Sequence, residues 1–164
     1  MFARLFKRRP EPAQPLYGAI VAAARQPKLY AAWGVPDTVD GRFDALVLHL
    51  ALVIERLHEA DAAFSTELLE TFCRDMDGNL RELGAGDLSV GKKVRRMAEA
   101  FYGRYDAYEA ARDEQAMLAA VSRNVYASAA HPMAAELALY ALAARQGLAQ
   151  QATADLMAGK VVFP

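Results

Sequence analysis

Alanine is the sequence feature that most restricts the fold of this chain. The 164 residues include 35 alanines, and these lie among Leu, Glu, Arg, Met and Gln, which are also strong helix formers. Only residues 161–163, near the end of the chain, have the β-branched and aromatic composition typical of a strand. The sequence therefore predicts an all-α fold, a single-domain bundle of about six to eight helices.

Size, charge and cysteine content narrow the class of protein. A chain in which 54% of residues are apolar can bury a core without metals or cross-links. A net charge of −1 argues against a protein that is basic overall, and we expect no DNA partner. The single Cys73 cannot form an internal disulfide, and no apolar run is long enough to span a bilayer. We therefore expect a soluble protein in a reducing compartment, which is the cytoplasm. Peripheral contact with the inner membrane is expected only through the basic residues 1–9.

The first 15 residues differ in composition from the rest. Residues 1–9 combine Phe2, Leu5 and Phe6 with four Lys or Arg and no acid, and prolines follow at positions 10, 12 and 15. Because proline does not continue a helix, residues 1–15 are predicted to be a basic N-terminal arm and linker, and residues 16–164 the helical domain. Two roles stay open for the arm: contact with anionic lipid or RNA, or a solvated tail.

Hydrophobic periodicity, capping residues and prolines predict the positions of the helices. A short turn is expected at 29–33 and a tail that packs back at 159–164. The helices are expected at about 16–26, 41–57, 62–76, 88–111, 114–126, 132–147 and 150–157.

The helix predicted at 41–57 is apolar on nearly every side. Its core spacing runs from Phe43 to Leu57, while Leu48 and Leu52 fall on the opposite face. Such a helix is either central in a bundle or presents a second apolar face to a partner. Leu48 and Leu52 are therefore candidate partner-binding residues.

The helix predicted at 88–111 has one apolar and one polar face, with two exceptions. Arg104 falls at the apolar edge, where it must either extend its charged end to water or find a carboxylate or several carbonyls as partners. Gly103 lies on the outer face, where a mid-helix glycine is usually compensated by close approach of another backbone. Candidate partner-binding residues on the outer face are Lys92, Lys93, Arg95, Arg96, Tyr102 and Gly103.

Catalytic and metal-binding patterns are missing from the sequence. His49, His58 and His131 have no metal-ligand spacing, and Cys73 has no neighbouring His or Lys. Asp75, with Asp77 and Asn79, imitates the start of a calcium loop, but the glycine and glutamate such a loop requires are absent. We expect no enzyme activity, no catalytic residue, no metal and no cofactor; a pocket where acids or His49 converge would reopen the question.

Several blocks of sequence resemble the ubiquinol-cytochrome c chaperone family. The blocks are VPDTVDGRF at 35–43, VLH at 47–49, MDGNLRE at 76–82, GDLSVGK at 86–92 and AFYGR at 100–104. They occur in the family's order, and the resemblance covers about residues 17–163. With no long transit peptide, the chain is similar to a bacterial member. The family-motif residues, expected to be structural, are Asp37, Thr38, Asp40, Gly41, Arg42, His49, Asp77, Arg81, Asp87 and Arg104.

The resemblance implies an α-helical, non-enzymatic chaperone that assists assembly of the cytochrome bc1 complex, respiratory complex III. Its implied partner is nascent or unassembled cytochrome b; mitochondrial relatives act near the ribosome with a small partner protein. An apolar groove edged by charge could shield the client's helices. Acids of 37–42 and 77–87 are expected to pair with Arg42, Arg81 and Arg104 as one fixed polar network.

A second function, from another class, also fits the sequence. The arm at 1–9 and the basic residues at 92–96 could dock an adaptor protein on a ribosome or on an anionic membrane. The two functions are compatible, because an adaptor can also hold a client.

Overall fold

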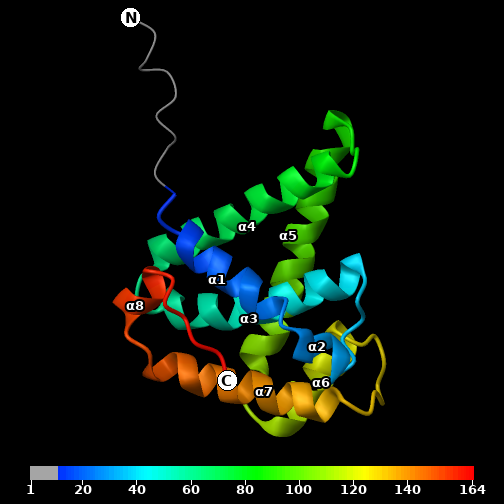
Figure 1. Cartoon of the computed structure of the whole chain (residues 1–164), viewed down its shortest axis with the longest axis vertical. Coiled ribbons are helices and arrows are strands. Elements are labelled where there is room, and N and C mark those ends of the chain that lie inside the picture. Colours follow the sequence, from blue (N-terminus) through cyan, green and yellow to red (C-terminus); the bar gives the residue numbers. More distant parts are fainter. Residues whose placement is uncertain (1–10) are drawn as a thin grey trace, which may run out of the picture.

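The computed structural model describes residues 11–164, and this part of the chain folds into eight helices without strands (Figure 1). The predicted arm at 1–9 lies outside the described residues. The all-α prediction is confirmed. The helices are α1 (Gln14–Ala24), α2 (Pro27–Ala31), α3 (Val39–His58), α4 (Ala62–Glu82), α5 (Asp87–Ala110), α6 (Glu114–Asn124), α7 (Ala134–Gln150) and α8 (Thr153–Met157).

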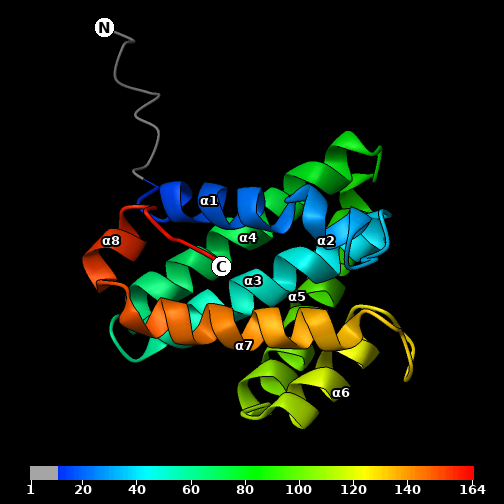
Figure 2. The same cartoon turned by 60° about the horizontal axis from the view of Figure 1, so that its bottom comes forward.

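Helix α3 is the centre of the bundle. It packs against α1, α4, α5 and α7, which surround it (Figures 1 and 2). Leu48 is 1% exposed and Leu52 is 2% exposed, so both faces of α3 are covered by the chain's own helices. Of the two roles that the sequence left open, the central position is the observed one. The prediction that Leu48 and Leu52 contact a partner is corrected, because neither reaches the surface.

The start of α3 is fixed by a cap and a close backbone contact. The Thr38 hydroxyl accepts a hydrogen bond from the Gly41 N–H at 3.1 Å, the usual geometry of a helix N-cap. A Cβ atom at Gly41 would collide with the carbonyl of Pro36. Glycine is therefore required at position 41 for the preceding loop to fold against the first turn of α3.

Helix α4 is longer than the sequence predicted. The expected end at Met76 is wrong: the helix continues through Gly78 to Glu82, and the Arg81–Asp77 ion pair at 2.7 Å supports its last turn. The chain then turns at Gly84, whose φ of 84° is left-handed. Hydrogen bonds from Gly84 N to Arg81 O and from Ala85 N to Leu80 O, each 3.0 Å, complete a Schellman motif.

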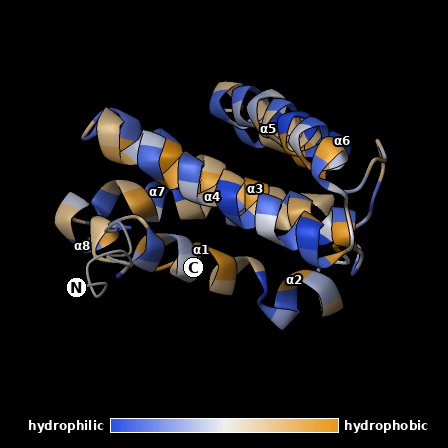
Figure 3. Cartoon of the chain, turned by 90° about the horizontal axis from the view of Figure 1, so that it is seen from above, coloured by the Kyte–Doolittle hydropathy of each residue, from blue (hydrophilic) through white to orange (hydrophobic). Residues whose placement is uncertain are grey.

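Helices α4 and α5 form a hairpin whose closed end extends beyond the rest of the bundle (Figures 1 and 2). Both helices carry hydrophilic as well as hydrophobic residues along their length (Figure 3). Between Met76 and Phe101, only Val90 is buried. The outer part of the hairpin therefore has little core of its own.

The C-terminal tail packs back on the bundle through Val161 and Phe163, as predicted, but not through Val162, for which the prediction is wrong. The Gln151 side chain accepts a hydrogen bond from Val162 N at 2.9 Å and donates one to Val162 O at 2.8 Å. The Phe163 ring meets the ring of His49 edge-on, with centroids 4.9 Å apart. Val162 itself points outward and is exposed.

The contact between Gly41 and Pro36 gives the first prediction. Gly41→Ala should lower the free energy of unfolding by about 1–3 kcal/mol, because the added methyl group has no space. Gly103→Ala is the matched control: no atom lies within 4 Å of a Cβ at Gly103, so this change should raise stability by up to about 1 kcal/mol. Urea denaturation measures both, and equal behaviour of the two variants would contradict the packing argument.

Candidate functional site

An open groove of 460 Å³ lies between α1, α3, α4 and α5. Its walls are mostly apolar, and each of the four helices contributes to them. The apolar lining residues are Val21, Ala24, Val39, Phe43, Leu46, Met76, Leu80, Leu83 and Met97.

Two apolar residues at the groove remain largely in water. Val39 is 70% exposed at the first turn of α3, and Leu83 is 74% exposed at the end of α4. The first turn of α3 is thus the part of the central helix that its neighbours leave uncovered. Apolar surface of this kind at the mouth of a groove is typical of a binding site for another apolar segment.

Charged residues border the groove. Arg25 and Arg42 lie on the side of α1 and α3, whereas Asp75 and Glu82 lie on α4. Arg42 pairs with Asp37 at 2.7 Å, which holds its side chain beside the N-terminus of α3. The groove therefore has opposite charges on its two sides.

Tyr17 fixes the position of Asp75. Its hydroxyl donates a hydrogen bond of 2.7 Å to Asp75 Oδ2, which joins α1 to α4. Burial, together with this carboxylate, raises the pKa of Tyr17 well above its ordinary range. The hydroxyl thus stays protonated and keeps its role as donor.

Under the groove, a buried ion pair joins α5 to α3. Arg104 Nη2 lies 2.8 Å from Asp44 Oδ1, and the guanidinium also lies 5.7 Å from the ring of Phe43, a groove residue. Burial raises the pKa of Asp44 to about 6, although Arg104 opposes this shift. Of the options that the sequence left open for Arg104, the carboxylate is the observed one, but the sequence analysis did not identify Asp44 as its partner. The sequence feature that could have identified Asp44 is its position as an acid within the apolar pattern of residues 43–57.

The prediction of one fixed polar network is wrong, because the structure contains three separate groups of ion pairs instead. Arg42 pairs with Asp37, Arg81 bridges Asp77 and Asp87, and Arg104 pairs with Asp44. The first two groups use the acids expected from 37–42 and 77–87. The third does not, because Arg104 is half-buried against α3, which supplies Asp44. Asp40 forms no ion pair with a residue of 11–164.

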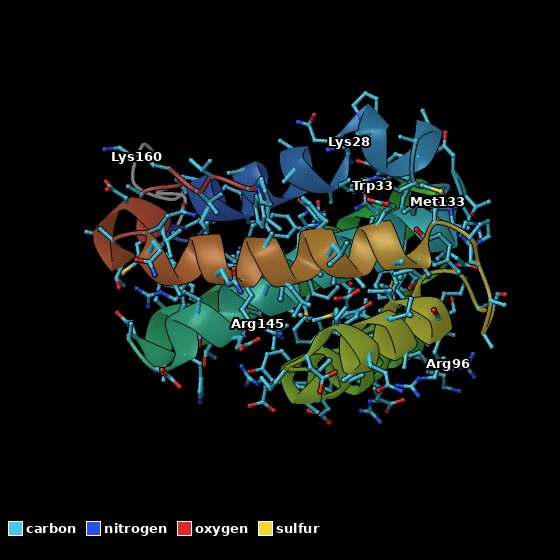
Figure 4. All side chains as sticks on the ribbon, turned by 90° about the horizontal axis from the view of Figure 1, so that it is seen from below. Lys28, Trp33, Arg96, Met133, Arg145 and Lys160 are labelled. Atoms are coloured by element: carbon cyan, nitrogen blue, oxygen red, sulfur yellow. The ribbon has the colours of Figure 1, made fainter. Side chains whose placement is uncertain are left out.

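A second cluster, absent from the sequence analysis, ties α7 to α3 and α5. Arg145 donates hydrogen bonds of 2.6 Å to the carbonyls of Tyr108 and Ala111 and lies 3.0 Å from Glu55. Figure 4 labels Arg145 on α7. These carbonyls are at the C-terminal end of α5, where a cation is favourable. Arg112 also binds Glu55, at 2.6 Å.

Two of the histidines, His49 and His131, pack against neighbouring side chains, whereas His58 is exposed at the end of α3. His49 is buried; its Nδ1 lies 2.7 Å from the Ala45 carbonyl, so Nδ1 donates, and its Nε2 then accepts from the Tyr140 hydroxyl at 2.7 Å. Burial lowers the pKa of His49 to about 4 and keeps the ring neutral. His131 stacks on Tyr126. Within residues 11–164, no group of three His, Cys, Asp or Glu could hold a metal.

The basic residues of α5 lie together on the surface. Lys92, Lys93, Arg95 and Arg96 are exposed, and none forms an ion pair with a residue of 11–164 (Figure 4 labels Arg96). Tyr102 is exposed two turns further along. The expected close approach to Gly103 does not occur within the described bundle, since no atom lies near it.

Fold and site together define a class: a helical-bundle protein with an apolar surface groove bordered by charge. The chain belongs to the ubiquinol-cytochrome C chaperone family, whose model matches residues 31–163. It is also similar to a solved structure described as the crystal structure of the Cbp3 homolog from Brucella abortus. That match has 39% sequence identity and a TM-score of 0.82, and covers 93% of this chain and 88% of that chain. A comparison with curated proteins finds no match.

Among residues 11–164, no helix combines the length and apolarity needed to cross a bilayer.

The Asp44–Arg104 pair gives the second prediction. The folded-state pKa of Asp44, about 6, lies above its ordinary value of 3.8, so its contribution to stability is present below about pH 4 and is lost as the pH rises through 6. Arg104→Gln removes the opposing attraction and raises that pKa further. The variant should therefore lose about 3 kcal/mol at about pH 8 and clearly less at about pH 4.

Urea denaturation across this pH range measures the effect. Arg42→Gln is the control, since it breaks an exposed pair and should cost less than about 1 kcal/mol. A loss for Arg104→Gln that is independent of pH would show that Asp44 is not the titrating partner.

Proposed function

We propose that this protein is a non-enzymatic assembly chaperone of the cytochrome bc1 complex and that its groove holds an apolar helix of unassembled cytochrome b. The observation that carries the proposal is the open apolar groove of 460 Å³ in a chain of the ubiquinol-cytochrome C chaperone family. Such a role needs a shaped surface and no catalytic group. The similarity to a Brucella abortus protein supports the expectation that this chain is a bacterial member of the family.

The size of the groove fits a short piece of helix. The α4 wall runs from Asp75 to Leu83, which corresponds to roughly 12 Å at 1.5 Å per residue. This length matches about two turns of a guest helix, with apolar side chains at positions i, i+3 or i+4, and i+7 facing the groove. Cytochrome b, a membrane subunit, offers such side chains before it is assembled.

The expected affinity is modest, which suits a chaperone. Each buried aliphatic side chain contributes about 1.5–3 kcal/mol, and association costs at least about 4 kcal/mol of translational and rotational freedom. Three or four anchors in the groove would therefore hold a client and still allow its release to the next assembly step.

The groove gives the third prediction. Val39→Glu places a charge on the exposed apolar side of the groove, and an acid is favourable in the first turn of a helix, so folding should be preserved. Capture of cytochrome b after crosslinking in cells should fall about tenfold. Accumulation of the bc1 complex should fall with it.

Leu139→Glu is the matched control, because Leu139 is exposed on α7 and outside the groove. Equal capture of cytochrome b by wild type and Val39→Glu would exclude the groove as the client site. Undiminished cytochrome b after deletion of the whole gene would exclude the client itself.

A second candidate function rests on the exposed basic residues of α5. Lys92, Lys93, Arg95 and Arg96, with the arm at 1–9, would serve an adaptor that docks on a ribosome or on an anionic membrane. Tyr102 could stack on a base, and the open backbone at Gly103 would allow a partner to approach closely. The arm lies outside the described residues, so α5 alone carries this argument.

The fourth prediction tests the adaptor. Lys92→Glu combined with Arg96→Glu should reduce sedimentation of the protein with ribosomes or with anionic vesicles, and added salt should reduce it further. If the double variant sediments with ribosomes and with anionic vesicles as the wild type does, the adaptor function is excluded.

A further inference from the structure

The closed end of the α4–α5 hairpin presents apolar side chains to water. Leu88, in the first turn of α5, is 97% exposed, and Leu83, at the end of α4, is 74% exposed. The hairpin extends beyond the bundle at this end (Figures 1 and 2). The Leu88 side chain therefore contributes no packing energy within the described chain. An exposed leucine of this kind is typical of a residue that contacts an apolar partner or a membrane.

The turn holds these leucines in place. The Schellman motif at Gly84 closes α4, and Arg81 pairs with Asp77 on its own helix and with Asp87 on α5. The two helix ends are thus joined by hydrogen bonds and charge. Leu83 and Leu88 are presented by a defined turn, so little conformational entropy is lost when they bind.

Cations follow directly along α5. Lys92 lies about 6 Å and Arg96 about 12 Å from Leu88 along the helix axis, at 1.5 Å per residue. Residues 77–96 hold five cations against three acids, and two of these acids, Asp77 and Asp87, are paired with Arg81. The end of the hairpin thus combines an apolar tip with an excess of positive charge.

We propose that this hairpin end docks on the surface of an anionic lipid bilayer. Leu88 and Leu83 enter the boundary between headgroups and acyl chains, about 5–10 Å deep, and Lys92 and Lys93 then lie at the level of the lipid phosphates. A nucleic acid would use the cations but leave Leu88 in water. A lipid surface uses both features, and the observations therefore favour it.

Docking in this way would bring the groove close to the bilayer, because Leu80 and Leu83 line the groove on the same part of α4. The inference rests on the membrane form of the second candidate function and adds the apolar tip to it, and it does not depend on the client. Leu88 does not line the groove, so a substitution there leaves the proposed client site intact.

The experiment uses the full chain and vesicles of equimolar phosphatidylglycerol and phosphatidylcholine, with pure phosphatidylcholine vesicles as reference. Leu88→Ser should weaken flotation with the anionic vesicles about tenfold. Lys92→Gln combined with Lys93→Gln should weaken it roughly 30-fold. Leu139→Ser and the pair Arg123→Gln and Lys160→Gln are matched controls on exposed sites elsewhere and should bind as the wild type does.

A second measurement places the tip in the bilayer. Leu88→Trp should be quenched by brominated lipids, whereas Leu139→Trp should not; the buried Trp33 is common to both. Binding that depends on the lysines but not on Leu88, with no quenching, would overturn the proposal in favour of purely electrostatic contact, as with RNA. Flotation that none of the hairpin variants changes would overturn it as well and would assign the contact to another part of the chain.

Discussion

The fold depends on the burial of α3, a helix that is apolar around its circumference. A helix of this kind is stable in water only when other helices cover every side of it, and α1, α4, α5 and α7 do so here. The buried pair of Arg104 and Asp44 fixes how α5 crosses α3, because leaving either charge without its partner would be costly. The Arg145 cluster fixes α7 against the same two helices.

The groove exists where this cover ends. Val39, Phe43 and Leu46, in the first two turns of α3, face a space that α1, α4 and α5 border but do not fill. Burial of apolar surface holds the bundle together around α3, but at the N-terminal end of α3 part of this surface remains exposed to water. A guest helix in this space would complete the cover, which connects the fold directly to the proposed chaperone role.

Much of the fold could be predicted from the sequence, because helix periodicity, N-caps and prolines are local signals. Examples are a capping residue within 37–40, observed as Thr38, and the special environment of Arg104 at the apolar edge of its helix. The identity of the partner of Arg104, Asp44, was not accessible, because the pairing of α3 with α5 depends on how distant segments pack. The end of α4 was misplaced for a related reason: Gly78 looks like a stop signal, and the ion pair and the hairpin that stabilise the helix beyond it are tertiary features. The groove draws on four helices and has no signature in any one of them.

The outer part of the α4–α5 hairpin has a consequence for the dynamics of the groove. With Val90 as the only buried residue between Met76 and Phe101, this segment is held mainly by backbone hydrogen bonds and surface ion pairs. Such segments open at lower free energy than the core and exchange their amide hydrogens faster. The wall of the groove that α4 forms beyond Met76 is thus locally less stable than α3, and its amide hydrogens should exchange while α3 stays packed.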